Sequence, residues 1–269
     1  MKGILLAIQF MTIVPVRVGG DVTAREIGRS AAFFPVAGAL QGVCAAAALL
    51  ASGWIFPPDI TAGLLVLVLA VASGGFDLDG LADTADGLAV KSSGDRKADI
   101  ERRLAVMKDS AAGAFGVLAL IMAILLKYLF LKYLIGSLLL APAAGLIFLL
   151  PVFSKWVTVP PMWYGRPARR DGLGSLFMEN AGFASTLWST CLTAAICIAL
   201  VAAGVFDAVP GAAIFLAGAA AVLGATGYSA VRFLSCRFGG LTGDHFGALA
   251  EVSEILFLMG ASVWLRRSF

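Results

Sequence analysis

The sequence predicts an all-α fold, a polytopic helical bundle embedded in a membrane, with about seven transmembrane helices in a single domain over residues 1–269. Three observations lead to this prediction. Apolar residues make up 60% of the chain and charged residues only 14%, whereas soluble domains have about 45–50% and about 25%. The mean hydropathy is +0.93. Most of the charge-free runs approach the roughly 20 residues that a helix needs to cross the hydrocarbon layer.

The amino-terminal stretch precedes the first span, and we expect it to stay attached. It lacks a small-residue cleavage pattern, and its apolar run contains the polar residues Gln9 and Thr12. Pro15 ends this run and Arg17 follows it. We interpret the stretch as a short re-entrant or interfacial helix.

The charge-free runs define the spans in chain order. We expect helices at 30–55, 60–76, 111–135, 138–160, 183–205, 211–231 and 247–265. Small residues over 34–53 and 211–227 favour close helix packing. Lys127 lies deep in the third span, so we expect it to pair with an acid or to snorkel, whereas Lys132 is close enough to the outer end to snorkel.

Basic residues gather in alternate loops, and the positive-inside rule places those loops on the cytoplasmic side. The connections near 56–59, near 135–137 and at 206–211 contain no lysine or arginine. The amino terminus is then inside. Arg266 and Arg267 would lie outside after the last span, which the same rule disfavours. That span is therefore re-entrant, or the number of spans is wrong by one.

Four aspartates lie within ten positions of GGFDLDGLADTADGL, at 74–88, directly after the charge-free run at 60–76. Asp79, Asp83 and Asp86 follow i, i+4, i+7 spacing, which places them on one face of a helix. Like charges so arranged repel, so this pattern favours a hard cation such as Mg²⁺ or Mn²⁺ between them, with Asp77 able to join. The alternative is a solvated acidic cap at a helix amino terminus.

The stretch GGLTGDHFGALAEVSE, at 239–254, repeats part of this pattern. Each stretch has two glycines followed by an aspartate, Asp79 in one and Asp244 in the other. Glu251 and Glu254 correspond in the same way to Asp83 and Asp86. We hypothesise that the two acidic faces converge on one cytoplasmic cavity and share metal ions.

Basic side chains between the two stretches suit phosphate oxygens. They are Arg96, Lys97, Arg102, Arg103 and Lys108, then Arg166, Arg169 and Arg170. Taken singly, each is better explained by the positive-inside signal or by contact with anionic lipid than by phosphate binding. Together with a metal-binding acid cluster they predict phosphoryl transfer. The segment MKDSAAGAFG, with Asp109, Ser110, Gly113 and Gly116, predicts a helix start with a polar cap and close approach to a helix or ligand.

The chain has a single histidine, His245, so it cannot supply both a Ser-His-Asp or Cys-His catalytic relay and a metal site built from several histidines. The four cysteines form no CxxC pair, so neither zinc nor disulfides are expected.

At this point the chain resembles the cobalamin synthase family, the adenosylcobinamide-GDP ribazoletransferases of bacterial inner membranes. The resemblance rests on the segments at 74–88 and 239–254, MKDSAAGAFGVLAL at 107–120 and AIQFMTIVPV at 7–16. The family often has histidine where this chain has Asp77 and an uncharged residue where it has His245. These departures leave the role of position 77 open.

The resemblance implies a single catalytic domain with its active site facing the cytoplasm, and Mg²⁺-dependent transfer from adenosylcobinamide-GDP to alpha-ribazole or its 5′-phosphate, with GMP released. It implies no nucleic-acid partner and leaves a homo-oligomer open. The expected catalytic residues are Asp79, Asp83, Asp86 and Glu251. The expected metal ligands are Asp77, Asp79, Asp83, Asp86, Glu251 and Glu254. The expected substrate-binding residues are Arg96, Arg102, Arg103, Lys108, Arg166, Arg170 and Asp244.

Two other functions compete with this interpretation. A membrane phosphotransferase of the CDP-alcohol type has a related motif, but the run from Asp79 to Asp83 has one spacer fewer and an aspartate in place of arginine. A cation transporter would bind ions near the bilayer midplane, whereas these acids lie at the ends of spans.

Overall fold

The computed structural model describes residues 2–109 and 111–268, which form helices joined by turns. In order, the elements are α1 (Lys2–Met11), α2 (Ala24–Ser30), η1 (Ala31–Phe33), α3 (Phe34–Ser52), α4 (Pro58–Ala72), α5 (Phe76–Ala89), α6 (Arg96–Val106), α7 (Ala114–Ser137), α8 (Leu140–Val157), α9 (Val159–Tyr164), α10 (Leu173–Asn180), α11 (Phe183–Ala202), α12 (Ala212–Phe238) and α13 (Gly243–Ser268). The predicted all-α class is confirmed.

Six helical segments of the described chain are long and apolar enough to cross a membrane. They are Ala24–Ser52, Ala114–Ser137, Leu140–Tyr164, Phe183–Ala202, Ala212–Phe238 and Gly243–Arg267. The pair α4 and α5 would be a seventh if its two bent halves count as one span. The chain is therefore a multi-pass membrane protein, as its hydropathy predicts.

The second predicted span, at 60–76, is the one that departs from a straight crossing. Helix α4 has 15 residues, so it is about 22 Å long, shorter than the roughly 30 Å hydrocarbon core. Gly74 and Gly75 adopt φ of +70° and +76° and end the helix, and α5 leaves at 88° to α4. By contrast α13 continues unbroken beyond Arg266, so the last span is not the re-entrant one.

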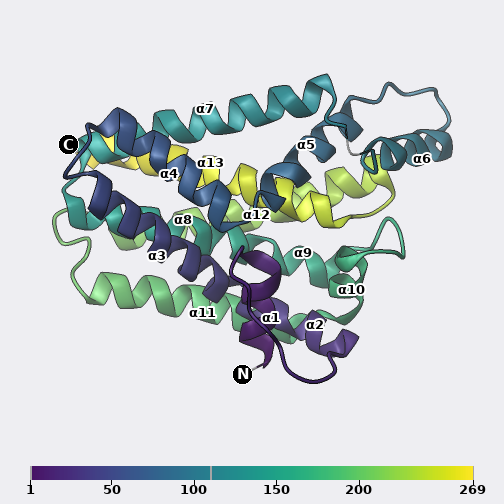
Figure 1. Cartoon of the computed structure of the whole chain (residues 1–269), viewed down its shortest axis with the longest axis horizontal. Helices are drawn as coiled ribbons and strands as arrows, with labels where there is room; N and C mark the ends of the chain where they lie inside the picture. Colours follow the sequence, from purple (N-terminus) through teal and green to yellow (C-terminus); the bar gives the residue numbers. More distant parts are fainter. Residues whose placement is uncertain (1, 110, 269) are drawn as a thin grey trace.

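Helix α8 is the most enclosed of these segments and forms the middle of the bundle (Figure 1). Its neighbour α3 crosses it through two glycines. A Cβ atom added to Gly38 would lie 2.4 Å from the Pro151 carbonyl oxygen, and one added to Gly42 would lie 2.2 Å from that of Phe148. The predicted close packing over 34–53 is therefore confirmed. Over 211–227 it is only partial, because Gly218 has no neighbour within 4 Å.

Helix α1 packs beside α2 and α3 rather than crossing the bundle (Figure 1). It ends at Met11, earlier than Pro15 predicts, and two contacts hold its end. The Gln41 side-chain amide donates to the Met11 carbonyl over 2.5 Å, and the Ile13 N–H donates to the Ala72 carbonyl over 3.0 Å. The amino-terminal segment thereby reaches the bend between α4 and α5.

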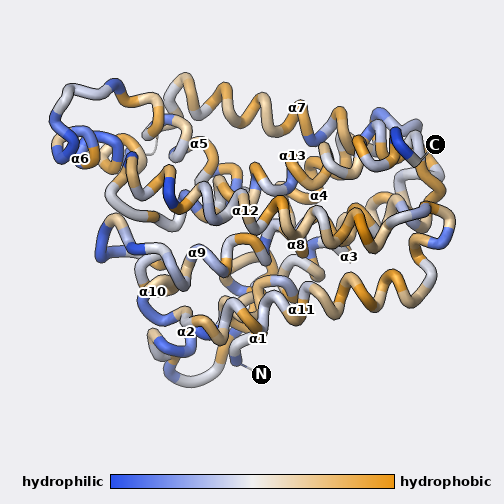
Figure 2. Tube along the Cα trace, turned by 180° about the vertical axis from the view of Figure 1, so that it is seen from behind, coloured by the Kyte–Doolittle hydropathy of each residue, from blue (hydrophilic) through white to orange (hydrophobic). Residues whose placement is uncertain are grey.

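The loops sort to the two ends of the molecule as the charge pattern predicts. The α6 helix, the loop before α10 and the α12–α13 turn share one end, while the carboxyl terminus lies at the other (Figure 1). Figure 2 shows hydrophilic segments gathered around α6 and α10. At the opposite end Lys132 forms an ion pair of 2.8 Å with Asp59, consistent with the predicted snorkelling.

Candidate active site

The two acidic stretches begin helices that cross each other. Gly75 and Gly239 both adopt left-handed φ, and α5 and α13 start shortly after them. Each helix places a glycine against the other. A Cβ atom on Gly80 would lie 2.5 Å from the carbonyl oxygen of Asp244, and one on Gly247 would lie 3.0 Å from the Cα atom of Asp77. The repeated sequence pattern thus marks two helices in direct backbone contact.

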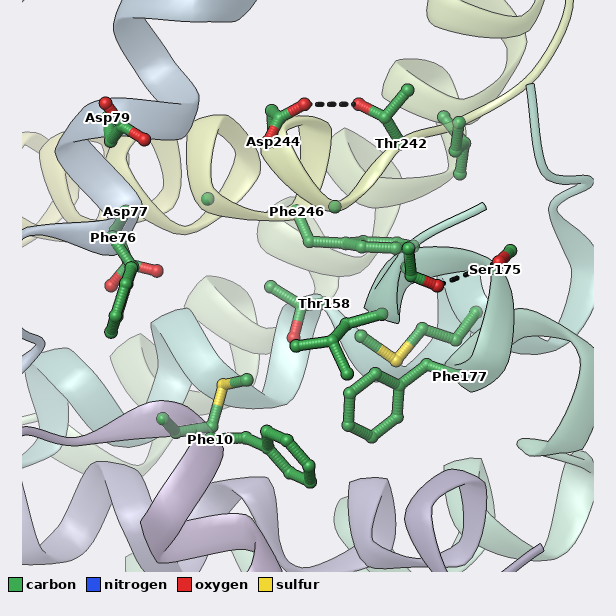
Figure 3. A pocket seen from close by; sticks show the side chains of 18 of the residues that line it. Phe10, Phe76, Asp77, Asp79, Thr158, Ser175, Phe177, Thr242, Asp244 and Phe246 are labelled. Carbon is green, nitrogen blue, oxygen red and sulfur yellow. Dashed lines mark hydrogen bonds between the residues drawn. The ribbon is translucent and has the colours of Figure 1, made fainter. Parts of the chain in front are cut away.

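A cavity of about 390 Å³ opens beside this crossing. Asp77 and Asp79 from α5 and Asp244 from α13 line it, together with Lys155 and Arg169 (Figure 3). The two acidic stretches therefore do converge on one cavity through their amino-terminal acids. Their later acids, described below, lie elsewhere.

The side chains of Asp79 and Asp83 differ from those of the other acids in the two stretches, because they have no hydrogen bond or ion pair within the described residues. Asp79 is exposed and Asp83 is half-buried. The charges of Asp79, Asp244 and Asp86 all act on Asp83, and Arg169 opposes them. Such repulsion between carboxylates favours a bound cation beside them.

Arg169 reaches Asp244 because the chain before α10 is tied to the start of α13. The Ala168 N–H donates to the Leu241 carbonyl over 2.8 Å. An Arg169 nitrogen then lies 3.3 Å from Asp244 Oδ2, and the Thr242 hydroxyl donates to the same oxygen over 3.1 Å. His245 is buried, and its Nδ1 accepts the Thr242 N–H over 3.0 Å, so this histidine caps α13.

Asp86 acts as the amino-terminal cap of α7. Its two carboxylate oxygens accept the Gly113 N–H over 2.7 Å and the Gly116 N–H over 2.8 Å. A Cβ atom at either glycine would meet these oxygens within 2.5 Å or less. The predicted helix start is present, but its polar cap comes from α5, while Asp109 lies outside the helix and Ser110 lies outside the described residues. Asp86 therefore joins the two segments.

Glu251 and Glu254 lie deeper in the bundle, where both pair with Lys127. The Lys127 Nζ atom is 2.7 Å from Glu251 and 2.6 Å from Glu254, and all three side chains are buried. The Ser154 hydroxyl adds a hydrogen bond to Glu254 over 3.2 Å. Of the two expectations for Lys127, pairing with an acid is confirmed. These glutamates form no part of the cavity lining.

Asp77 is paired with Lys155 of α8, which is almost fully buried. The sequence interpretation missed Lys155, although a lysine inside the predicted span at 138–160 is the kind of residue that marks a functional or paired site in a membrane. It also placed Arg169 among the basic residues without choosing it for the site. It chose Arg166 and Arg170 instead, because membership of one basic segment does not indicate which arginine faces inward.

None of the six predicted phosphate-binding bases lines the cavity. Arg102 pairs with Asp99 at 2.6 Å, the buried Arg103 donates to the Arg237 carbonyl over 2.9 Å, and Lys108 pairs with Asp171 at 3.1 Å. Arg96, Arg166 and Arg170 also lie off the cavity. Lys108 comes near it through its partner Asp171, and Arg170 stands between the lining residues Arg169 and Asp171.

Asp99 organises the loop that leads into α6. Hydrogen bonds from the Ser92 hydroxyl, and from the Ser93 N–H and hydroxyl, lower its pKa well below the ordinary value. This network leaves Arg102 anchored to its own helix rather than directed at the cavity.

The arrangement limits how a metal ion could be held. Among the residues that the structure describes, no three acidic, histidine or cysteine side chains come together as a metal site. Four of the six acids predicted as ligands have other partners, which leaves Asp79 and Asp83. Mg²⁺ is usually held by one or two carboxylates together with water and substrate phosphates. The two free carboxylates fit that type of site.

Comparison with known proteins supplies independent information. The family model described as cobalamin-5-phosphate synthase matches residues 3–262. A relative from Thermodesulfovibrio yellowstonii, named adenosylcobinamide-GDP ribazoletransferase, is 35% identical over 97% of each chain. Proteins of the same name from Desulfitobacterium hafniense and Pseudomonas aeruginosa are 34% identical, over 97% of this chain and 96% of the relative, and 33% identical, over 98% of both. No solved structure matches the chain.

Proposed function

The chain belongs to the cobalamin-5-phosphate synthase family, and from that premise we propose that this transferase moves the adenosylcobinamide-phosphate group of adenosylcobinamide-GDP onto alpha-ribazole or its 5′-phosphate. GMP is the leaving group. The observation that carries the proposal is the convergence of Asp79 and Asp244 beside Arg169 at one cavity, with Asp83 near enough for all three charges to act on it. This is the charge arrangement that a diphosphate substrate requires.

The reaction forms one bond and breaks one. A ribose hydroxyl oxygen attacks the phosphorus that carries the cobinamide, the bond from that phosphorus to the GMP oxygen breaks, and the hydroxyl proton passes to a carboxylate. When bound, Mg²⁺ would neutralise charge on the diphosphate and on the leaving oxygen. Asp79 and Asp83 are the residues we assign to hold it, because their oxygens are free.

In this proposal Arg169 and Asp244 position the diphosphate of the donor. A guanidinium group matches phosphate oxygens, and the ion pair with Asp244 holds that of Arg169 beside the acids of the cavity. Asp83 or Asp244 accepts the proton, since each carries a carboxylate within the group. Glu251 and Glu254 are not assigned as ligands, because both pair with Lys127 and neither lines the cavity.

GMP release by the purified protein in lipid, with both substrates and Mg²⁺, tests the proposal. Asp83→Asn should lower the rate at least about 10²-fold, because it removes both a ligand charge and a proton acceptor. Asp59→Asn, at the opposite end of the bundle, is the matched control. Equal rates for wild type and Asp83→Asn would contradict the role of this carboxylate, and turnover only with CDP-alcohols would establish the alternative phosphotransferase.

We place the protein in a bacterial inner membrane, with the α6 and α10 end facing the cytoplasm. The positive-inside rule supports this orientation, because Lys91 lies in the loop before α6, Arg96 begins α6 and Arg170 lies in the loop before α10. Labelling of single cysteines introduced at Lys91 and at Asp207 in intact and in opened cells tests it. Labelling of position 91 in intact cells would reverse the orientation.

A further inference from the structure

The cavity has an aromatic part that the acidic chemistry does not use. Phe10 of α1, Phe34 of α3, Phe177 of α10 and Phe246 of α13 line it. Figure 3 shows Phe10 and Phe177 on the side away from Asp79. Phe177 is the shared ring, with centroids 5.5 Å from Phe10 and 5.3 Å from Phe34, both edge to face. Four separate helices thus supply rings to one space.

We infer that this aromatic part binds the base of the nucleoside acceptor and thereby determines which substrate lies inside the protein. The inference rests on the proposed function. Alpha-ribazole is a riboside of a flat bicyclic aromatic base, and flat aromatic groups stack on phenylalanine rings. Because a ligand stacked here would lie next to the acids, one cavity would hold both the base and the reacting hydroxyl.

The size of the cavity favours the acceptor over the donor. Its volume of about 390 Å³ is near the lower end of small-molecule sites, which run from about 300 to 1,000 Å³. A nucleoside fits within such a space. A corrinoid macrocycle carrying an adenosyl group and a guanosine diphosphate does not, so only the diphosphate of the donor reaches the acids, while its ring remains outside.

The polar groups around the rings favour an uncharged occupant. Among the described residues of the lining, the two cations Lys155 and Arg169 already pair with acids. The hydroxyls of Thr158 and Ser175 donate to the main-chain carbonyls of Lys155 and Gly172, each over 2.8 Å. No free cation therefore faces the rings to receive a phosphate. A neutral base satisfies this environment.

The position of Phe177 depends on the same backbone contacts that form the acidic part. A Cβ atom on Gly174 would lie 2.5 Å from the Gly243 nitrogen, so α10 packs directly against the start of α13. At its other end α10 contacts Gly28 of α2 through Asn180, where an added Cβ would come within 2.3 Å. The ring that we assign to the base is thus held in fixed relation to Asp244.

The test compares binding and turnover in Phe177→Leu and Phe10→Leu. Each keeps an apolar side chain but removes the aromatic face, and Phe115→Leu, an exposed ring on α7, is the control. The Kd for alpha-ribazole, measured without donor, should rise about tenfold in the first two variants and stay unchanged in the control. The KM for adenosylcobinamide-GDP should not change. Melting temperatures show whether each variant remains folded.

Three results would overturn the inference. They are an unchanged Kd for alpha-ribazole in both variants, a rise confined to the KM of the donor, and equal losses in Phe115→Leu. The binding assay separates this inference from the proposed function. If wild type binds alpha-ribazole through Phe177 but releases no GMP, the cavity assignment stands and the transfer reaction is wrong. If GMP is released and both variants bind normally, the reverse holds.

Discussion

Replacement of Gly80 by alanine tests whether the crossing of α5 and α13 sets the geometry of the acids. The new Cβ would lie 2.5 Å from the Asp244 carbonyl oxygen, whereas ordinary contacts begin at 3.4 Å. The two helices must therefore separate by about 0.9 Å at this point. A displacement of about 1 Å in a catalytic arrangement can cost about 10²-fold in rate. Overpacking of this kind also costs about 1–3 kcal/mol of stability.

The assay is GMP release from adenosylcobinamide-GDP with alpha-ribazole and Mg²⁺, paired with thermal unfolding in the same detergent. Gly247→Ala, whose Cβ would lie 3.0 Å from Asp77, requires a smaller separation and should lose less activity. Gly63→Ala on α4 meets no atom within 4 Å and should behave as wild type. The reasoning is refuted if Gly80→Ala, still folded, retains most of the wild-type rate or if Gly63→Ala loses as much.

Three further predictions concern the charges outside the cavity. Lys127→Met leaves Glu251 and Glu254 buried without a cation, so the free energy of unfolding in detergent should fall by about 3–5 kcal/mol. A triple variant that also changes both glutamates to glutamine should recover most of this loss. An equal loss in the single and the triple variant would contradict the pairing. Asp86→Ala removes the acceptor of two α7 amides, so the free energy of unfolding should fall by about 1–3 kcal/mol. Amide hydrogen exchange should speed up at the start of α7, and unchanged exchange there would be inconsistent with the cap. Asp99, whose pKa is lowered, stabilises the fold above its unfolded pKa near 4 and loses this effect as the pH falls below that value. The difference in melting temperature between wild type and Asp99→Asn should therefore be present at pH 7 and shrink in strong acid. A difference that grows on acidification would contradict the lowered pKa.

The spans and the location of the acids follow from the sequence because they depend on local properties. A run without charge predicts a membrane helix whatever surrounds it, and most predicted bounds agree with the structure within a few residues. The span at 211–231 extends to Phe238, and the span at 60–76 ends early, at Ala72. The composition of the 60–76 segment is that of a straight helix. The direction of α5 depends instead on the positive φ of Gly74 and Gly75 and on the packing of Gly80 against α13.

The roles of the individual charges could not be predicted in the same way. The spacing places Asp79, Asp83 and Asp86 on one helical face and does not distinguish them. The same role was therefore predicted for all three. Contacts with residues about 27–30 positions away make Asp86 a helix cap. Contacts with α8 pair Asp77 with Lys155, and contacts with α7 pair the two glutamates with the one Lys127. Each of these partners is distant in sequence and has no motif of its own.

The amino-acid sequence by itself determined that this chain spans a bilayer, where its helices lie, and which two stretches concentrate negative charge. It could do so because hydropathy and helical periodicity are properties of neighbouring residues. Only the tertiary structure decided which carboxylates remain available for chemistry. A buried charge is tolerated once it finds a counter-charge or a backbone donor, and which of them do so depends on contacts between helices that are far apart along the chain.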